Sequence, residues 1–190
     1  MQEGKVGRGM SDDGLYRAYL AGDQNAGDQL MLRWGDALTA YLAAFFHNNE
    51  DAEDLMLDCF SVILVNKPRI GEGNFRAYLF KMGRNKANRL WRLRLRQREF
   101  SLDEELPAAG NSPAEAVLSG ERSAILHRCL NRIPPQYREA LWLIYDGELS
   151  YAQAAEVMGC SVKKIDNLLA NGKKRMREEL EKEGITHADV

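Results

Sequence analysis

The chain has 190 residues, a formal net charge of −2 and 45% hydrophobic residues, so its composition is that of an ordinary globular protein. This composition excludes a wholly disordered chain, and the length allows one domain or two small ones. We expect neither a membrane span nor a signal peptide, because no long apolar run occurs and the N-terminus is polar. The three cysteines (Cys59, Cys129, Cys160) form no CxxC pair, which argues against a disulfide framework or a zinc site and favours a reducing cytoplasm.

Ser11 is the expected N-cap of a first helix. The apolar side of that helix would carry Leu15, Tyr19 and Leu20. A second helix is predicted over residues 30–46, where apolar residues recur at helical spacing. No β-branched run with alternating polarity occurs in the chain, so the sequence predicts helices and no sheet.

A third helix is expected to begin at Asp51 and to end before Pro68. Its buried stripe would consist of Leu55, Cys59 and Ile63, with Phe60 and Leu64 on the adjoining flank. Residues 71–74 have the composition of a turn, and a fourth, long helix is predicted from Phe75 to about Arg98.

The third and fourth helices carry opposite charge. Residues 50–58 hold five carboxylates and no base, whereas residues 76–98 hold nine Lys and Arg residues and no acid. Aromatic residues accompany the basic segment: Phe75, Tyr78, Phe80 and Trp91. Basic side chains neutralise phosphates and aromatic rings stack on unpaired bases, so this segment favours nucleic-acid binding. The alternative is a solvated helix face above an ordinary aromatic core.

Residues 101–119 contain two prolines and a Gly-Asn pair, which is typical of an interdomain linker. A further helix is predicted over 121–132. Pro134 and Pro135 interrupt it, and the next helix covers 136–145.

The chain then shows a helix-turn-helix pattern. Ser150 and Gln153 form an expected capping box for a short helix over 151–158, and Gly159 suits a left-handed C-cap. Ser161 would cap the last helix, over residues 162–182. Its buried stripe would be Ile165, Leu168, Leu169, Met176 and Leu180. A short helix, a tight glycine turn and a polar, basic second helix favour a DNA-binding unit, and the alternative is a corner packed for stability only.

Two motif sets occur in order along the chain. The first comprises EDAEDLMLDCF, GEGNFRAYLF and KMGRNKANRLWRLRLR; the second is IPPQYREALWLIYDGELSYAQAAEVMGCSVKKIDNLLANGKKRMREEL. Together they resemble bacterial RNA polymerase sigma factors of the sigma-70 class, in the compact form of the extracytoplasmic-function (ECF) subgroup. The resemblance covers roughly residues 11–182. It implies an all-α fold of two small helical domains, 10–98 and 120–184, joined by a linker over 99–119, with the helix-turn-helix in the second domain.

The resemblance also implies a function and the residues that perform it. The chain would bind core RNA polymerase and direct promoter-specific initiation, reading the −10 and −35 elements and assisting DNA melting. The polymerase-binding residues would be Asp54, Leu55, Asp58 and Phe60. The −10 element would be bound by Arg84, Asn85, Lys86, Asn88, Arg89 and Arg92, of which Asn85, Asn88, Arg89 and Arg92 share a helix face.

The −35 element would be bound by Ser161, Lys163, Lys164, Asn167, Asn171, Lys173 and Lys174. This helix departs from the family pattern, because Asp166 and Leu168 stand where the family often has a basic residue. Gly172 lies in mid-helix, where glycine costs about 1 kcal/mol relative to alanine. We therefore expect an unusual −35 sequence or a weak −35 contact.

Partners implied by the resemblance are core polymerase, promoter DNA and an anti-sigma factor, without membrane insertion, in the cytoplasm. The first alternative is a stand-alone helix-turn-helix regulator, which leaves the acidic and basic helices unexplained. The second is a nucleic-acid enzyme, since Asp51, Asp54 and Asp58 share a helix face that could hold a metal. No histidine or glycine-rich phosphate loop accompanies these carboxylates. We accordingly expect no enzyme: no catalytic residue, no metal and no cofactor.

Overall fold

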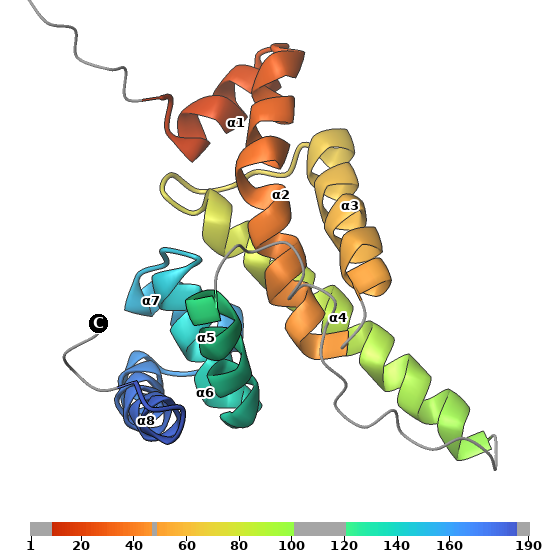
Figure 1. The fold of residues 1–190 in the computed structure, drawn as a ribbon. Helices are drawn as coiled ribbons and strands as arrows, with labels where there is room; N and C mark the ends of the chain where they lie inside the picture. Colours follow the sequence, from red (N-terminus) through yellow and green to blue (C-terminus); the bar gives the residue numbers. More distant parts are fainter. Residues whose placement is uncertain (1–8, 47–48, 101–120, 186–190) are drawn as a thin grey trace, which may run out of the picture.

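The structure is a computed structural model that describes residues 9–46, 49–100 and 121–185, and in these ranges every regular element is a helix (Figure 1). The N-terminal bundle consists of α1 (Asp12–Leu20), α2 (Gln24–Phe46), α3 (Asn49–Asn66) and α4 (Phe75–Phe100). The C-terminal bundle consists of α5 (Glu121–Arg132), α6 (Pro135–Tyr145), α7 (Tyr151–Met158) and α8 (Val162–Lys182). The predicted all-α class is confirmed. Residues 101–119 of the predicted linker lie outside the described residues.

The expected start of α1 and both expected ends of α7 are confirmed, and each is marked by a capping residue. The Ser11 hydroxyl accepts a hydrogen bond from the Gly14 amide at 3.1 Å and caps α1. Ser150 and Gln153 form the complete capping box of α7, and Gly159 ends that helix with a left-handed φ of +64°. Short polar side chains satisfy amides that have no partner within a helix, which is why these residues mark the boundaries.

Two expectations for the first two helices are wrong. Helix α2 begins at Gln24, six residues before the predicted Leu30, because its first turn is polar and carries no apolar signal. Leu20 is 42% exposed and does not belong to the apolar side of α1. Tyr16 is buried in its place, and its hydroxyl donates to the Pro68 carbonyl at 2.7 Å.

The turn before α4 forms where it was predicted. The Asn74 amide donates to the Gly71 carbonyl at 3.1 Å, and Gly73 has a φ of +75°, a conformation that favours glycine. Helix α4 then continues to Phe100, slightly past the predicted end at Arg98. This turn sets the direction of the basic helix, whose far end extends beyond the rest of the N-terminal bundle (Figure 1).

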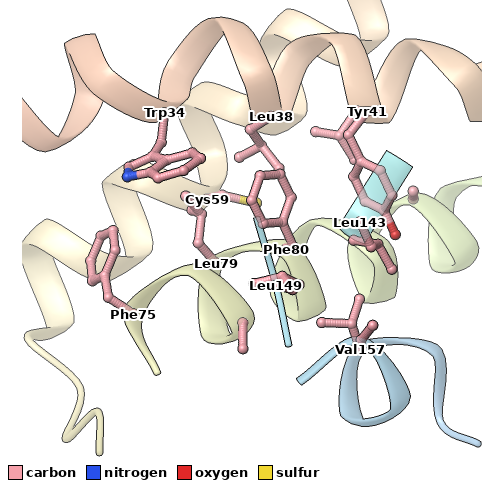
Figure 2. Close-up of a cluster of buried hydrophobic side chains, with 14 of the residues drawn as sticks. Trp34, Leu38, Tyr41, Cys59, Phe75, Leu79, Phe80, Leu143, Leu149 and Val157 are labelled. Carbon is pink, nitrogen blue, oxygen red and sulfur yellow. The ribbon is translucent and has the colours of Figure 1, made fainter. Parts of the chain in front are cut away.

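One hydrophobic core runs through both bundles. Figure 2 shows side chains from α2, α3, α4, α6 and α7 in the same cluster, among them Trp34, Tyr41, Cys59, Phe80, Leu143 and Val157. Helix α4 packs against α2 and α3 on one side and against α7 on the other. The basic helix therefore lies between its own bundle and the helix-turn-helix.

Candidate protein and nucleic-acid interfaces

The outward side of α3 forms a surface that we call the acidic face. Its members are exposed and recur at helical spacing: Glu53, Asp54, Leu57, Asp58, Ser61 and Val65. Two of them are large apolar side chains, with Leu57 51% and Val65 75% exposed. Leu57 has the carboxylates of Glu53, Asp54 and Asp58 as helical neighbours, which suits a partner that offers an apolar contact surrounded by basic groups.

The four residues predicted for polymerase binding divide between this surface and the core. Asp54 and Asp58 are exposed on the acidic face, whereas Leu55 is half-buried against the core. Phe60 is 0% exposed, so its ring offers no surface to a partner and supports the face from beneath. Sequence reasoning missed Leu57 and Val65, although both stand outside the buried stripe of Leu55, Cys59 and Ile63.

Carboxylates of α3 pair with bases of α4. Asp51 accepts two hydrogen bonds from the Arg94 guanidinium, both at 2.6 Å, and Asp58 pairs with the Lys86 ammonium. The hydrogen bond to Asp51 raises the pKa of Arg94. These pairs fix α4 against α3 and occupy Lys86, one of the residues predicted to bind DNA.

The exposed side of α4 presents a second candidate surface, the basic face, formed by Asn85, Arg89, Arg92 and Arg96. Arg89 and Arg92 make no ion pair within the described residues and are therefore free to bind phosphate. Trp91, on a neighbouring stripe of the same helix, is 52% exposed. The predicted face is thus brought together for Asn85, Arg89 and Arg92, while Asn88 is half-buried beside it.

Arg84 is placed differently from the other residues predicted for the −10 element. Its guanidinium donates to Glu139 of α6 at 2.7 Å, and only 24% of the side chain is exposed. Partial burial acts to lower the pKa of Arg84, but the hydrogen bond and the charge of Glu139 outweigh burial, and the pKa is raised. The arrangement seen here therefore withholds Arg84 from the basic face.

The leading turns of α8 present a third surface, on which Lys163, Lys164 and Asn167 are exposed. The Ser161 hydroxyl accepts from the Lys164 amide at 3.2 Å, so this side chain caps the helix. The Asn171 side chain donates to the Asn167 carbonyl at 2.8 Å. Lys163, Lys164 and Asn167 are therefore available to bind DNA. The side chains of Ser161 and Asn171 bond to the backbone of α8 and support the helix.

Farther along α8 the predicted bases have partners on the protein. The Lys173 ammonium lies 5.3 Å from the centre of the Tyr145 ring, and its hydrogen bond to that residue raises the pKa of Lys173. Lys174 lies 4.0 Å from Glu178, one turn away. Both lysines remain exposed.

The unusual residues of α8 have a structural explanation. Leu168 is buried and faces the core of the C-terminal bundle, so it does not replace a DNA-binding base. Gly172 is buried against α6: a Cβ atom there would lie 3.2 Å from the Leu141 side chain and 3.4 Å from Tyr137. Only Asp166 stands exposed on the surface beside the lysines.

The described ranges contain neither a candidate metal site nor a candidate membrane span. No group of three His, Cys, Asp or Glu side chains within them could hold a metal ion, the α3 carboxylates included. None of the helices in these ranges is long and apolar enough to cross a bilayer.

Two family models match the chain. The model of sigma-70 region 2 matches residues 30–98, and the model of sigma-70 region 4 matches residues 123–176. The first range contains the acidic and basic faces, and the second contains the helix-turn-helix. The matches therefore cover every surface described above.

Known sigma factors are similar along most of the chain. The RNA polymerase sigma factor NccH of Alcaligenes xylosoxydans xylosoxydans is 28% identical, covering 87% of this chain and 92% of NccH. The ECF RNA polymerase sigma factor SigW of Bacillus subtilis is 24% identical, covering 84% of this chain and 91% of SigW. The sigma factor RpoE of Bartonella quintana, solved with the anti-sigma factor NepR, has a TM-score of 0.64 and 26% identity over 81% of this chain and 96% of RpoE. The chain belongs to the sigma-70 class of RNA polymerase sigma factors, in the ECF subgroup.

Proposed function

We propose that this sigma factor docks on core RNA polymerase through the acidic face of α3, binds the −10 element through α4 and binds the −35 element through α8. The observation that carries the proposal is the occurrence of three exposed surfaces of fitting chemistry within the two matched regions. The matched ranges support a first domain over 10–98, a linker over 99–119 and a second domain over 120–184. Sigma factors initiate transcription without being enzymes, and we assign no catalytic residue.

The polymerase contact combines apolar and charged parts. Leu57 would fill an apolar contact at its centre, because a half-exposed leucine gains most from being covered by a partner. Asp54 and Glu53, both exposed, would steer a basic partner and set its orientation. Such charges act mainly on the association rate and on specificity.

The −10 contact would use phosphate binding and base stacking. Arg89 and Arg92 would hold the backbone, and Asn85 could bind a base edge. Trp91 offers an exposed ring beside them. Melting exposes unpaired bases, and stacking such a base on an aromatic ring stabilises the single strand by about 1–3 kcal/mol. No bond needs to be cleaved for this step.

The −35 contact would place the start of α8 in the major groove, as recognition helices of this motif do. Lys163 and Lys164 would neutralise phosphates, and Asn167 would reach a base edge. Lys173 and Lys174 lie farther along the helix and would hold the backbone. Asp166 is repulsive to phosphate but can accept a hydrogen bond from cytosine, which favours an unusual −35 sequence.

An anti-sigma factor is proposed as a further partner, supported by the structure of RpoE with NepR. The exposed acidic and basic faces are the surfaces that such an inhibitor would need to cover. We also propose that the protein acts in the cytoplasm, where core polymerase is found. A stand-alone helix-turn-helix regulator is not favoured, because region 2 is matched as well as region 4.

The test is binding to core polymerase, measured with purified protein and followed by run-off transcription from a promoter library. Leu57→Asp should weaken binding at least tenfold, since it introduces a charge at the centre of the contact. Leu32→Asp is the matched control. It makes the same chemical change on α2, where Leu32 is 82% exposed and lies outside the acidic face. Equal binding by both variants and the parent would place the docking surface elsewhere, and no binding by the parent would overturn the function.

A further inference from the structure

We infer that two tyrosines of α6 are positioning residues for DNA binding by α8. Tyr137 and Tyr145 hold Arg175 and Lys173 on opposite flanks of α8, where the two cations bind the two phosphate strands that border the −35 major groove. The inference rests on the proposed function, because it requires α8 to lie in that groove. It adds Arg175 to the DNA contacts and gives α6 a part in them.

Each of the two tyrosines carries a cation of α8 on its ring. The Lys173 ammonium nitrogen lies 5.3 Å from the centre of the Tyr145 ring. The central carbon of the Arg175 guanidinium lies 5.2 Å from the centre of the Tyr137 ring. A cation within about 6 Å of a ring centre is attracted by the negative face of the ring. The two distances therefore describe two separate cation–π contacts between α6 and α8.

The two cations lie on opposite flanks of α8. Residues two positions apart in a helix do not share a face, so Lys173 and Arg175 project in nearly opposite directions. Gly172 is buried on the side that contacts α6, where a Cβ atom would lie 3.2 Å from the Leu141 side chain. Lys173 and Arg175 thus leave α8 on either side of its contact with α6.

A stripe of α6 runs beneath both flanks of α8. Tyr137, Leu141 and Tyr145 follow one another at intervals of four residues and therefore share one side of the helix. From Tyr137 to Tyr145 the stripe is about 12 Å long, at 1.5 Å per residue. The major groove of B-DNA is also about 12 Å wide. A cation at each end of the stripe can therefore reach one of the two strands that border the groove.

The tyrosines hold these cations without cancelling their charge. Neither Lys173 nor Arg175 pairs with a carboxylate in the part of the chain that the structure describes, and both are exposed. A neutral ring covers one side of a cation and leaves the other side for a phosphate. The hydrogen bond to Tyr145 raises the pKa of Lys173, so the ammonium keeps its proton.

Holding a cation in place before DNA arrives lowers the entropy that is lost on binding. Lysine and arginine side chains have many rotamers, and fixing one of them opposes association. A cation that already rests on a ring has lost part of this freedom. The tyrosines would thereby strengthen two phosphate contacts and favour no particular base, because phosphate contacts carry no sequence information directly.

The first test is a double-mutant cycle on promoter binding by the complex with core polymerase. Lys173→Ala should weaken binding about threefold and lower the slope of log affinity against log salt concentration by about 0.9. Tyr145→Leu should weaken binding about twofold and leave the slope nearly unchanged, because it removes no charge. In the Lys173→Ala background, Tyr145→Leu should cost nothing further.

Lys174→Ala is the matched control for this cycle. Lys174 is the next residue along α8, and its ammonium lies 4.0 Å from Glu178. In the Lys174→Ala background, Tyr145→Leu should still weaken binding about twofold. An undiminished cost of Tyr145→Leu in the Lys173→Ala background would show that Tyr145 acts on DNA or on the fold by itself, and would overturn the inference.

The second test assigns each cation to a strand. Promoter duplexes carry uncharged methylphosphonates beside the −35 element, on one strand or on the other. The cost of Lys173→Ala should vanish on only one of these duplexes, and the cost of Arg175→Ala only on the other. Tyr137→Leu should follow Arg175→Ala, and if it fails to fold the Arg175→Ala result decides alone. Loss of both costs on the same duplex, or of neither, would overturn the inference.

Failure of the proposed function has a different signature. Equal binding of the parent complex to the promoter and to a duplex with a scrambled −35 element would count against the −35 contact. The same cycle, measured on the scrambled duplex, would then decide whether Tyr145 acts through Lys173, because phosphate binding does not depend on sequence. A parent complex that binds neither duplex would overturn both.

Discussion

The two basic helices, α4 and α8, differ in how many of their basic side chains pair with carboxylates of the same chain. On α4, Arg84, Lys86 and Arg94 are each bound by a carboxylate from another helix. On the leading turns of α8, Lys163 and Lys164 are exposed and pair with no carboxylate in the described residues. DNA that reaches Arg84, Lys86 or Arg94 must therefore compete with carboxylates of the same chain, whereas Lys163 and Lys164 are open to DNA.

This difference explains how a chain with a net charge of −2 can bind DNA. Its bases are not neutralised uniformly. On α4, carboxylates of α3 and α6 pair with Arg84, Lys86 and Arg94, while Arg89 and Arg92 have no ion pair in the described residues. A polymerase that covers α3, or a transition that moves α6 away, would change the charge presented by α4 without altering α8. Under the proposed function, recognition of the −10 element would therefore depend on what covers α3 and on where α6 lies.

The largest effect is expected from removing the free guanidinium groups of α4. Arg89→Ala with Arg92→Ala should weaken promoter binding by the polymerase complex about 100-fold, at about 1.5 kcal/mol for each charge-assisted contact. The slope of log affinity against log salt concentration should fall by roughly 1.5 to 2. Open-complex formation measured across a salt series checks both values.

The matched pair on α8 sharpens this result. Lys163→Ala with Lys164→Ala should cost only about tenfold, because lysine binds phosphate as a point charge and Asp166 already offsets part of it. Equal losses for the two pairs would show that the helices contribute alike. Wild-type transcription by the α4 variant would show that α4 is not the promoter-melting element.

A second difference between α4 and α8 lies in how closely each helix packs against its neighbouring helix. Gly83 brings α4 close to α2: a Cβ atom at this position would lie 3.0 Å from the Leu38 side chain and 3.4 Å from Leu42. Gly83→Ala should lower the free energy of unfolding by about 2 kcal/mol, because overpacking of this core exceeds the gain in helix propensity. Urea unfolding measures the change. Asn85→Ala, exposed on the same helix, should stabilise slightly, and a stabilising Gly83→Ala would contradict the close approach.

The buried thiol of Cys59, which lies beneath α4, adds a pH dependence to the stability of the protein. Burial raises the pKa of Cys59 from 9.0 to about 12. The raised value means that its stabilising contribution is complete below pH 9 and is lost as the pH rises from 9 towards 12, because the unfolded thiol ionises first. The free energy of unfolding should be about 1.4 kcal/mol lower at pH 10 than at pH 8 from this group.

Cys59→Ala isolates that contribution. The variant loses the ionisable group, so the decline between pH 8 and pH 10 should be smaller than in the parent, whatever its stability at pH 8. Urea unfolding at the two pH values gives the comparison. The same decline in both proteins would show that Cys59 does not titrate in this way.

Local signals predicted the parts of the fold that depend on neighbours in sequence. Ser11, Ser150 and Gly159 mark helix ends because the groups they satisfy lie within a few residues. Periodicity also found Ile165, Leu168 and Leu169 on the buried side of α8, whereas the predicted Met176 and Leu180 are only half-buried. It also placed Cys59 and Phe60 on the buried side of α3, and both are 0% exposed. The family resemblance, and not periodicity, assigned Phe60 to the polymerase-binding residues.

The sites were harder to predict because their state depends on distant residues. Nothing near Arg84 in sequence indicates that Glu139, 55 residues later, binds its guanidinium. Helical spacing identified the exposed groups of α4 and α8. It did not show which of them already pair with a carboxylate of the same chain. Long-range pairing is decided by packing between bundles, and a single sequence does not reveal it.

Gly172 shows the same limit and gives the smallest expected effect. In sequence it is a mid-helix glycine with a cost; in the structure it allows α8 to approach Leu141 and Tyr137 of α6. Gly172→Ala gains about 1 kcal/mol in helix propensity and loses a similar amount to crowding, so the free energy of unfolding should change by less than about 1 kcal/mol.

The control is Ala170→Gly, two residues away and exposed on the same helix. It changes propensity without packing and should cost the full value of about 1 kcal/mol. If Gly172→Ala stabilises the protein by that same amount, Leu141 and Tyr137 move aside without cost and α8 is loosely seated. If it is as damaging as Gly83→Ala, both basic helices are seated equally tightly, and only their occupation by carboxylates distinguishes them.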